Sequence, residues 1–345
     1  MLGALVGALL ALLLCGAAPA AAQHAPAPPA PSASAGGQSS APPSWAVWLL
    51  PQVSAPTPAA GETGAEFRLR AARLRVRGAE SGLRYFVQVD VAAAPRLWDA
   101  VLTVPLPGRP AGASLALDAG VMRAPVGASH LTPIPLVPLG ERPAFVRALV
   151  PGREPGGTGR LPGLAVRSVW PAAAVAAGAY TARREAGQDG TQAYAPVLAA
   201  RGEARAGPLR GGASAAARYV PDAGGERAWG HVVGVDVHLD AGAAWLGAEA
   251  MAGRRLTGPL PPEAAATRYA GATLEGGFAR GALEMRAGLE ALREEEGRAG
   301  EAHGSAWHLE PVGALRYALG PSAALLARVA PHDDAPLTLR LILAP

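Results

Sequence analysis

The sequence predicts an all-β fold, an antiparallel transmembrane β-barrel of about sixteen strands, with twelve to sixteen as the range. Three observations lead to it. Short segments alternate apolar and polar residues, their polar faces are charged while their apolar faces carry few aromatic residues, and aromatic residues lie near segment ends. A lipid-facing surface needs only to be apolar, whereas a soluble core needs large side chains. A soluble β-sandwich or β-helix is the alternative.

The period of two is the primary sign of half-buried strands. In residues 83–91, Leu83 and Val87 share one face, while Arg84 and Gln88 share the other. The same alternation recurs in four further segments, at 232–240, 282–290, 307–319 and 337–343. No segment of comparable length has a helical period, so we predict consecutive strands with no helix between them.

The predicted strands follow one another with turns rich in Gly, Pro and Asp between them. They are expected at 45–53, 66–78, 83–92, 97–106, 113–122, 161–170, 173–182, 194–206, 209–220, 229–240, 242–254, 266–279, 281–293, 304–319, 321–331 and 335–344. Tight turns such as Glu80-Ser81-Gly82 contrast with longer loops such as 256–265, an asymmetry typical of outer-membrane barrels. In lipid every backbone polar group needs an internal partner, so the sheet must close.

Composition and charge exclude several classes of protein. The 345 residues include 31 basic ones, all arginine, against 27 acidic ones. The arginines are interleaved with acids, and no basic block or recognition motif indicates nucleic acid. Outside the N-terminus no run of about 18 apolar residues predicts a membrane-spanning helix.

The N-terminal residues predict export. Leu5 to Leu14 form an apolar stretch, and Ala20-Ala21-Ala22 resembles a cleavage site, so 1–22 is predicted to be a signal peptide. A lipid anchor at Cys15 is the alternative. Residues 23–43, rich in Pro, Ala and Ser, are expected to form a disordered linker, because they cannot bury enough apolar surface to order themselves. The barrel domain is therefore assigned to 44–345.

One stretch, residues 123–160, interrupts the regular series of predicted strands. Prolines recur along it at 125, 133, 135, 138, 143, 151 and 155, and they exclude paired strands. A loop this long is commonly functional. It is expected either to fold into the lumen as a constriction or to remain a solvated outer loop.

Arginines are concentrated in the second predicted strand: Arg68, Arg70, Arg73, Arg75 and Arg77. The first two share one face and the other three share the opposite face, which predicts a β-bulge around Ala71-Ala72. A charge that faces lipid at mid-bilayer costs about 2–4 kcal/mol, so most of the five should face the lumen. Acidic candidates for the lumen would oppose them: Asp90, Asp236, Asp240, Glu249, Glu284 and Glu290.

Several stretches carry a resemblance to a known family: 67–78 (FRLRAARLRVRG), 85–90 (YFVQVD), 97–100 (LWDA), 120–127 (GVMRAPVG), 141–143 (ERP) and 151–156 (PGREPG). They are similar to the first part of the phosphate-selective porins, the family of porins O and P. The similarity is specific over 66–160. It implies an outer-membrane barrel, commonly a homotrimer, that passes anions through an arginine-lined pore. The chain departs from the family in having no lysine and no terminal aromatic residue.

The residues expected to line the pore or bind anions are Arg68, Arg70, Arg73, Arg75, Arg77, Arg84, Arg142, Arg147 and Arg153. Planar guanidinium donors favour phosphate and carboxylate ligands. The expected function is passive diffusion of small hydrophilic solutes, with anions preferred, across the outer membrane of a Gram-negative bacterium. A non-conducting exported β-protein with a structural or binding role is the alternative.

The sequence contains no motif that indicates catalysis, a metal site or a cofactor. A nucleophile elbow, a phosphate-binding loop and a zinc-protease motif are all missing. His231 and His238 fall on opposite faces of one strand, so they cannot share a metal. The expected partners are outer-membrane lipid and small anionic solutes. The chain is not expected to be an enzyme.

Overall fold

The computed structural model describes residues 41–55, 65–92, 95–107, 112–133, 136–151, 159–184, 193–221, 227–254, 268–295, 297–298, 301–302, 306–331 and 336–343. The predicted signal peptide and most of the predicted linker lie outside these residues. Strand β1 begins at Ala41, three residues before the predicted start of the barrel at 44. Among the described residues, no helix is long and apolar enough to cross a membrane.

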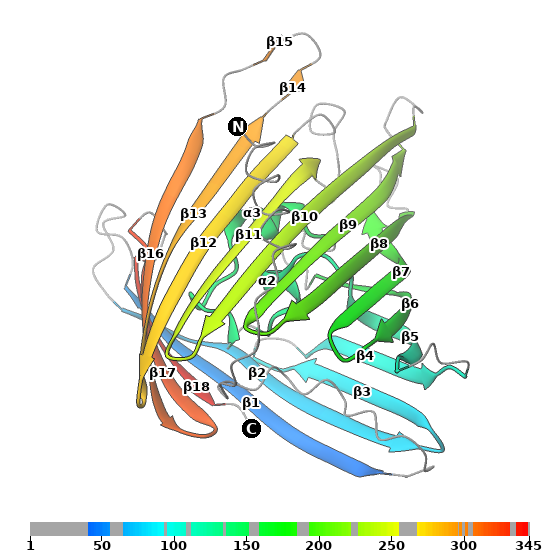
Figure 1. Cartoon of the computed structure of the whole chain (residues 1–345), viewed down its shortest axis with the longest axis horizontal. Helices are drawn as coiled ribbons and strands as arrows, with labels where there is room; N and C mark the ends of the chain where they lie inside the picture. The colour runs from blue at the N-terminus through cyan, green and yellow to red at the C-terminus, as the bar shows by residue number, and fades with distance from the viewer. Residues whose placement is uncertain are drawn as a thin grey trace.

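Sixteen antiparallel strands form one closed barrel, in which each strand pairs with its neighbours along the chain and β1 pairs with β18 (Figure 1). The strands are β1 (Ala41–Ala55), β2 (Glu66–Glu80), β3 (Leu83–Asp90), β4 (Arg96–Pro105), β5 (Ser114–Arg123), β6 (Arg160–Val169), β7 (Ala173–Arg184), β8 (Ala193–Ala206), β9 (Leu209–Pro221), β10 (Arg227–Ala241), β11 (Ala244–Arg254), β12 (Arg268–Arg280), β13 (Leu283–Glu295), β16 (Trp307–Gly320), β17 (Ala323–Val329) and β18 (Leu337–Leu343). A separate pair, β14 (Gly297–Arg298) and β15 (Glu301–Ala302), lies in the connection from β13 to β16. Each of the sixteen predicted segments overlaps one barrel strand, so the predicted fold and strand number are confirmed.

Alternation between the two faces of each strand produces a barrel that is apolar outside and polar inside. In β18, Leu339 is 47% exposed, whereas the next residue, Arg340, is 2% exposed. In β10, Val233 and Val235 are likewise exposed, whereas Val232, which directly precedes Val233, is buried. Exposed aliphatic side chains therefore cover the outer surface, as a lipid-facing band requires.

A β-bulge in β2 shifts the phase of the arginines, as predicted. Leu50 of β1 pairs with Ala71, but the next residue, Pro51, pairs with Leu69, so Arg70 is the extra residue. The bulge therefore lies one residue before the predicted Ala71-Ala72 position. An extra residue exchanges the two faces of a strand from that point onward.

Because of the bulge, arginines from both halves of β2 face the same side. Arg68 lies opposite Gln52, and Arg73 lies opposite Trp48, two β1 residues that are both buried inside the barrel. The two sets of arginines, which a regular strand would place on opposite faces, therefore both line the lumen.

The two ends of the barrel differ in the length of their connections. Five connections at one end contain two residues each, for example Ser81-Gly82 and Gly207-Pro208. Ser81 and Gly82 both have positive φ, at 50° and 81°, which is the conformation of a type I′ hairpin turn. The other end carries the longer loops, of which the connection from β5 to β6 is the longest. Short turns at one end and long loops at the other are the pattern of outer-membrane barrels.

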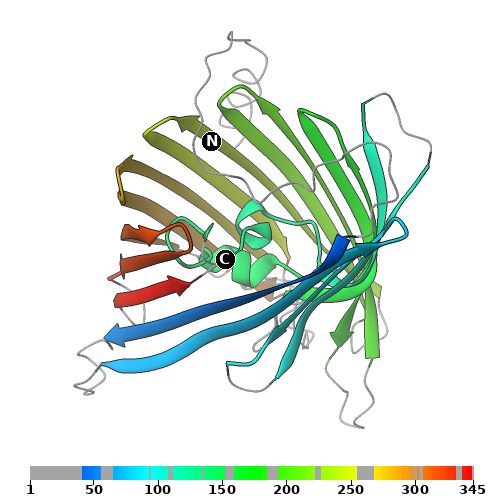
Figure 2. The same cartoon turned by 90° about the horizontal axis from the view of Figure 1, so that it is seen from below.

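The long connection between β5 and β6 folds into the barrel, as Figure 2 shows. We call residues 124–159 the inner loop; it contains helices α2 (Ala128–Leu131) and α3 (Ala144–Leu149). Phe145, Val146 and Leu149 of α3 are completely buried in a cluster with Val232 and Met251 of the barrel wall. The prediction of a lumenal loop is therefore confirmed, and the alternative of a solvated outer loop is not.

Candidate functional site

The lumen is the candidate functional site, and arginines line one side of it. Six of the nine arginines predicted for the site lie on the lumen face of two neighbouring strands: Arg68, Arg70, Arg73, Arg75 and Arg77 of β2, and Arg84 of β3. We call this surface the arginine wall. Arg84 belongs to it because it pairs with Ala79, which shares a face with Arg77. The members of the wall differ in how their charges are compensated.

Arg73 is a neutralised and rigidly held member of the wall. Its Nε lies 2.9 Å from Oδ2 of Asp90, and its guanidinium lies 3.9 Å from the ring centre of Trp98 and 4.7 Å from that of Trp48. The residue is 3% exposed. An ion pair combined with cation–π contacts on two rings fixes this charge in the wall, so it is not available to a solute.

A second arginine, which sequence reasoning missed, completes the same cluster from β6. Arg160 lies 4.4 Å from the ring of Trp98 and donates to both carboxylate oxygens of Asp99, at 3.0 and 3.3 Å. Arg167, also of β6, pairs with Asp118 in the same bidentate way. Alternation along β6 could have indicated lumenal arginines, but the contacts depend on strands that are distant in sequence.

Four arginines of the wall form no ion pair among the described residues. Arg75 donates to the neutral amide of Gln88 at 2.6 Å, and Arg77 donates to the hydroxyl of Ser44 at 3.2 Å. No carboxylate contacts Arg68 or Arg84 in this part of the chain. The arginine wall therefore carries uncompensated positive charge toward the lumen.

The inner loop is tied to the arginine wall through a single carboxylate. Glu141 of the loop forms ion pairs with Arg70 of β2 and Arg340 of β18. Burial by itself would raise the pKa of Glu141, but the two guanidinium charges outweigh it and lower the pKa to about 2. Arg340 also donates to the carbonyl of Gly140, so one arginine holds two consecutive residues of the loop.

The opposite wall is acidic. Five residues are consecutive register partners across β10, β11, β12, β13 and β16, and we call them the acidic row: Asp236, Glu249, Thr273, Glu290 and Glu310. Of these strands, β10 lies directly across the barrel from β2, and β11, β12, β13 and β16 follow it round the wall toward β1 (Figure 2). Asp236 is neutralised by Arg201, with an Nη1–Oδ2 distance of 2.6 Å. The predicted lumenal acids Asp236, Glu249 and Glu290 all belong to this row.

The acidic row also supports the inner loop. The backbone N–H of Ser129 donates to Glu249 at 3.1 Å, and that of Ala144 donates to Glu290 at 3.3 Å. Contacts on both walls therefore suspend the loop across the lumen, between the uncompensated arginines and the acids.

The remaining predicted arginines belong to the inner loop and differ in role. Arg147 of α3 is exposed. Arg142 is 4% exposed and donates to the carbonyls of Ser129 and Thr132, at 2.9 and 2.7 Å. Its guanidinium therefore holds the loop in shape, which differs from the predicted pore-lining role. Arg153 lies outside the described residues. Among the described residues no group of three His, Cys, Asp or Glu side chains could hold a metal ion.

A closed barrel of sixteen antiparallel strands with a long loop folded into its lumen defines the porin fold, and solved porins resemble it. An OmpT variant of Vibrio cholerae that lacks loop L8 has a TM-score of 0.61 and 12% identity, over 88% of this chain and 99% of that one. The outer-membrane channel DcaP of Acinetobacter baumannii has a TM-score of 0.58 and 13% identity, over 88% and 97%. A porin refined at 1.8 Å has a TM-score of 0.56 and 15% identity, over 88% and 99%.

These likenesses show the fold, and identities this low show no more than the fold. No protein-family model matches the chain, and no curated protein is similar to it at a significant level. The particular resemblance to phosphate-selective porins therefore stays a prediction.

Proposed function

We propose that the protein is an outer-membrane porin that gives small hydrophilic solutes passive passage and prefers anions. The observation that carries the preference is the set of arginines without ion pairs on the arginine wall, Arg75 and Arg77 above all. An arginine whose charge is not cancelled lowers the electrostatic barrier for an anion and offers planar N–H donors to it. Phosphate or a similar oxyanion fits this chemistry.

Three features of the chain support an outer-membrane location. Exposed aliphatic residues cover the outside, the connections are short at one end and long at the other, and the N-terminal sequence resembles an export signal. We propose a homotrimer as the assembly. OmpT of Vibrio cholerae, which has a TM-score of 0.57 to this chain, is described in a trimer form. We also propose that the chain has no catalytic role.

The reversal potential of single channels under a KCl gradient tests the anion preference. In the variant R75Q/R77Q/R84Q the reversal potential should move toward the cation side, because three lumenal charges are removed. The matched control is R167Q/D118N, which removes an ion pair from the same lumen without changing its net charge. An unchanged reversal potential in the triple variant would contradict the anion preference but not the porin assignment.

A non-conducting barrel with a binding or structural role is the second candidate, favoured by how tightly the inner loop packs. Phe145 and Val146 are completely buried against the wall, and the loop is bound to both sides of the lumen. Discrete current steps from folded, membrane-inserted protein would exclude this candidate. Folded barrels that give no steps would favour it over a porin.

A further inference from the structure

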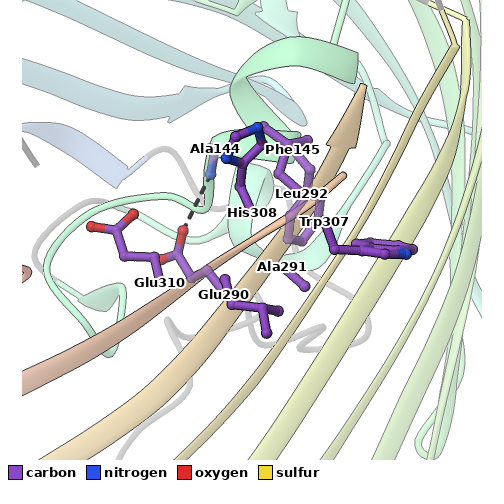
Figure 3. Close-up of a pocket in the computed structure, with 9 residues that line it drawn as sticks. Ala144, Phe145, Glu290, Ala291, Leu292, Trp307, His308 and Glu310 are labelled. Carbon is purple, nitrogen blue, oxygen red and sulfur yellow. Dashed lines mark hydrogen bonds between the residues drawn. The ribbon is translucent and has the colours of Figure 1, made fainter. Parts of the chain in front are cut away.

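Two aromatic residues of β16 mark the edges of the apolar band on the outer face of the barrel. Trp307 and Tyr317 are 47% and 48% exposed, and Figure 3 shows Trp307 pointing away from Glu290 and Phe145 on the lumen side. At about 3.3 Å per residue and a tilt of about 40°, their separation along the strand corresponds to roughly 25 Å across the membrane. That height is typical of a lipid-facing band between two aromatic girdles, so Trp307 marks the membrane interface at the loop end.

Arginines gather at this interface on three neighbouring strands. Arg293 of β13 is the register partner of Trp307. Arg268 of β12 pairs with Glu295, which lies two residues closer to the loops than Arg293. Arg254 of β11 in turn pairs with Arg268. We call Arg254, Arg268 and Arg293 the rim arginines, and they lie at the level where lipid headgroups begin.

The rim arginines belong to the outer face of the barrel. Tyr269, which follows Arg268, is 7% exposed and belongs to the buried cluster inside the barrel. Leu292, which precedes Arg293, packs against the same cluster. Consecutive residues of a strand point to opposite faces, so Arg268 and Arg293 face outward, and Arg254 shares the face of its register partner Arg268.

The charge of the rim arginines is only partly compensated. Arg293 forms an ion pair with Glu295, at 2.6 Å. Neither Arg254 nor Arg268 forms an ion pair in the described part of the chain, and like charges on direct register partners repel each other. An anion bound between these two guanidinium groups would relieve the repulsion.

The surroundings of the rim arginines are apolar. On β17, β18, β1 and β2, exposed apolar residues occupy the loop ends of the strands on the outer face: Val329, Leu337, Val53 and Phe67. On the membrane side of the rim arginines, Leu274, Leu289 and Leu309 are 53%, 45% and 57% exposed. The outer face therefore presents positive charge at the interface and, next to it, an aliphatic surface within the band.

We propose that the rim arginines bind the phosphate headgroup of an outer-leaflet lipid, whose acyl chains lie on this aliphatic surface. The proposal rests on the proposed outer-membrane location, in which the long loops face the outside of the cell. Guanidinium groups bind phosphate through charge-assisted and often bidentate hydrogen bonds. Each basic residue near an anionic lipid surface strengthens binding by roughly fivefold. Because this site faces lipid, it is separate from the arginine wall in the lumen.

Native mass spectrometry of the folded full-length protein, with lipid A titrated into the detergent, tests this site. Lipid A is a phosphorylated glycolipid with several acyl chains, which is the chemistry that the site fits. Saturable binding is expected, and R254Q/R268Q should raise the half-saturating mole fraction of lipid A by about tenfold or more. R254K/R268K keeps both charges and should retain most of the binding. Phosphatidylcholine, whose headgroup has no net charge, should not saturate a site.

R280Q is the matched control, because Arg280 is an exposed arginine at the opposite end of the same strand, β12. It should leave lipid A binding unchanged. Equal binding by wild type and folded R254Q/R268Q, an equal loss in R280Q, or displacement of lipid A by equimolar inorganic phosphate would overturn the proposal. If heat-modifiable mobility shows that the double variant does not fold, R268Q alone is compared with R280Q. The reversal potential of R254Q/R268Q channels should equal that of the wild type, so a failure of this proposal is distinguishable from a failure of the proposed anion preference.

Discussion

Glu141 and Arg340, which are 199 residues apart in the chain, form an ion pair that joins the inner loop to the last strand of the barrel. Arg70 of β2 binds the same carboxylate, with an Nη2–Oε2 distance of 2.5 Å. Because β18 and β2 lie on either side of β1, this one side chain joins the loop to the region where the barrel closes. The position of the loop in the lumen and the closure of the barrel are therefore coupled.

Replacing Glu141 with glutamine should loosen the inner loop. The change removes the negative charge that compensates two arginines, and breaking a charged contact of this kind costs on the order of 1–3 kcal/mol, reduced here because the carboxylate is partly exposed. Single-channel recordings should show more frequent transitions between current levels than the wild type shows. The control E203Q changes a lumenal glutamate far from the loop anchor and should leave the transition frequency unchanged. Equal transition frequencies in the two variants would contradict the anchoring role.

The pH dependence of the Glu141 contribution follows from its lowered pKa. A carboxylate with a folded-state pKa of about 2, below its ordinary value of 4.5, stabilises the fold fully above the ordinary value and loses that effect as the pH falls through about 2. The difference in thermal midpoint between wild type and E141Q should therefore be constant from about pH 7 to pH 5 and shrink toward pH 2. A difference that has already vanished at pH 5 would mean that Glu141 is not held ionised.

Removing Arg73 should destabilise the barrel more than removing Arg77. Arg73→Met leaves Asp90 buried without its partner and takes away the contacts with Trp48 and Trp98, a loss of about 3–5 kcal/mol if the cluster cannot relax. Arg77→Met removes one hydrogen bond to Ser44 at an exposed position and should cost little. Heat-modifiable gel mobility as a function of temperature compares the two variants; equal transition temperatures would show that the cluster is not structural.

Local patterns were sufficient to predict the barrel, but not the pairing of charges inside it. Alternation locates each strand, and the shift in arginine phase within 68–77 predicts a bulge, because both depend on neighbours in sequence. The contacts of Arg160 with Trp98 and Asp99 join β6 to β4, and no local pattern encodes which strands become neighbours in space. The structural role of Arg142 could not be predicted for the same reason, because the carbonyls that it binds are brought together only by the fold of the loop.

A methyl group added at Gly271 should displace the inner loop, because this glycine lies directly beneath α3. A Cβ atom there would lie 2.2 Å from Cβ of Phe145, a separation that real side chains do not reach, so α3 or β12 must move. Gly271→Ala is therefore expected to lower the thermal midpoint and to change single-channel conductance together. Gly313→Ala is the matched control, since a Cβ at that β16 position would meet no atom within 4 Å. Conductance and midpoint equal to those of the control would show that α3 does not pack on Gly271 in the membrane.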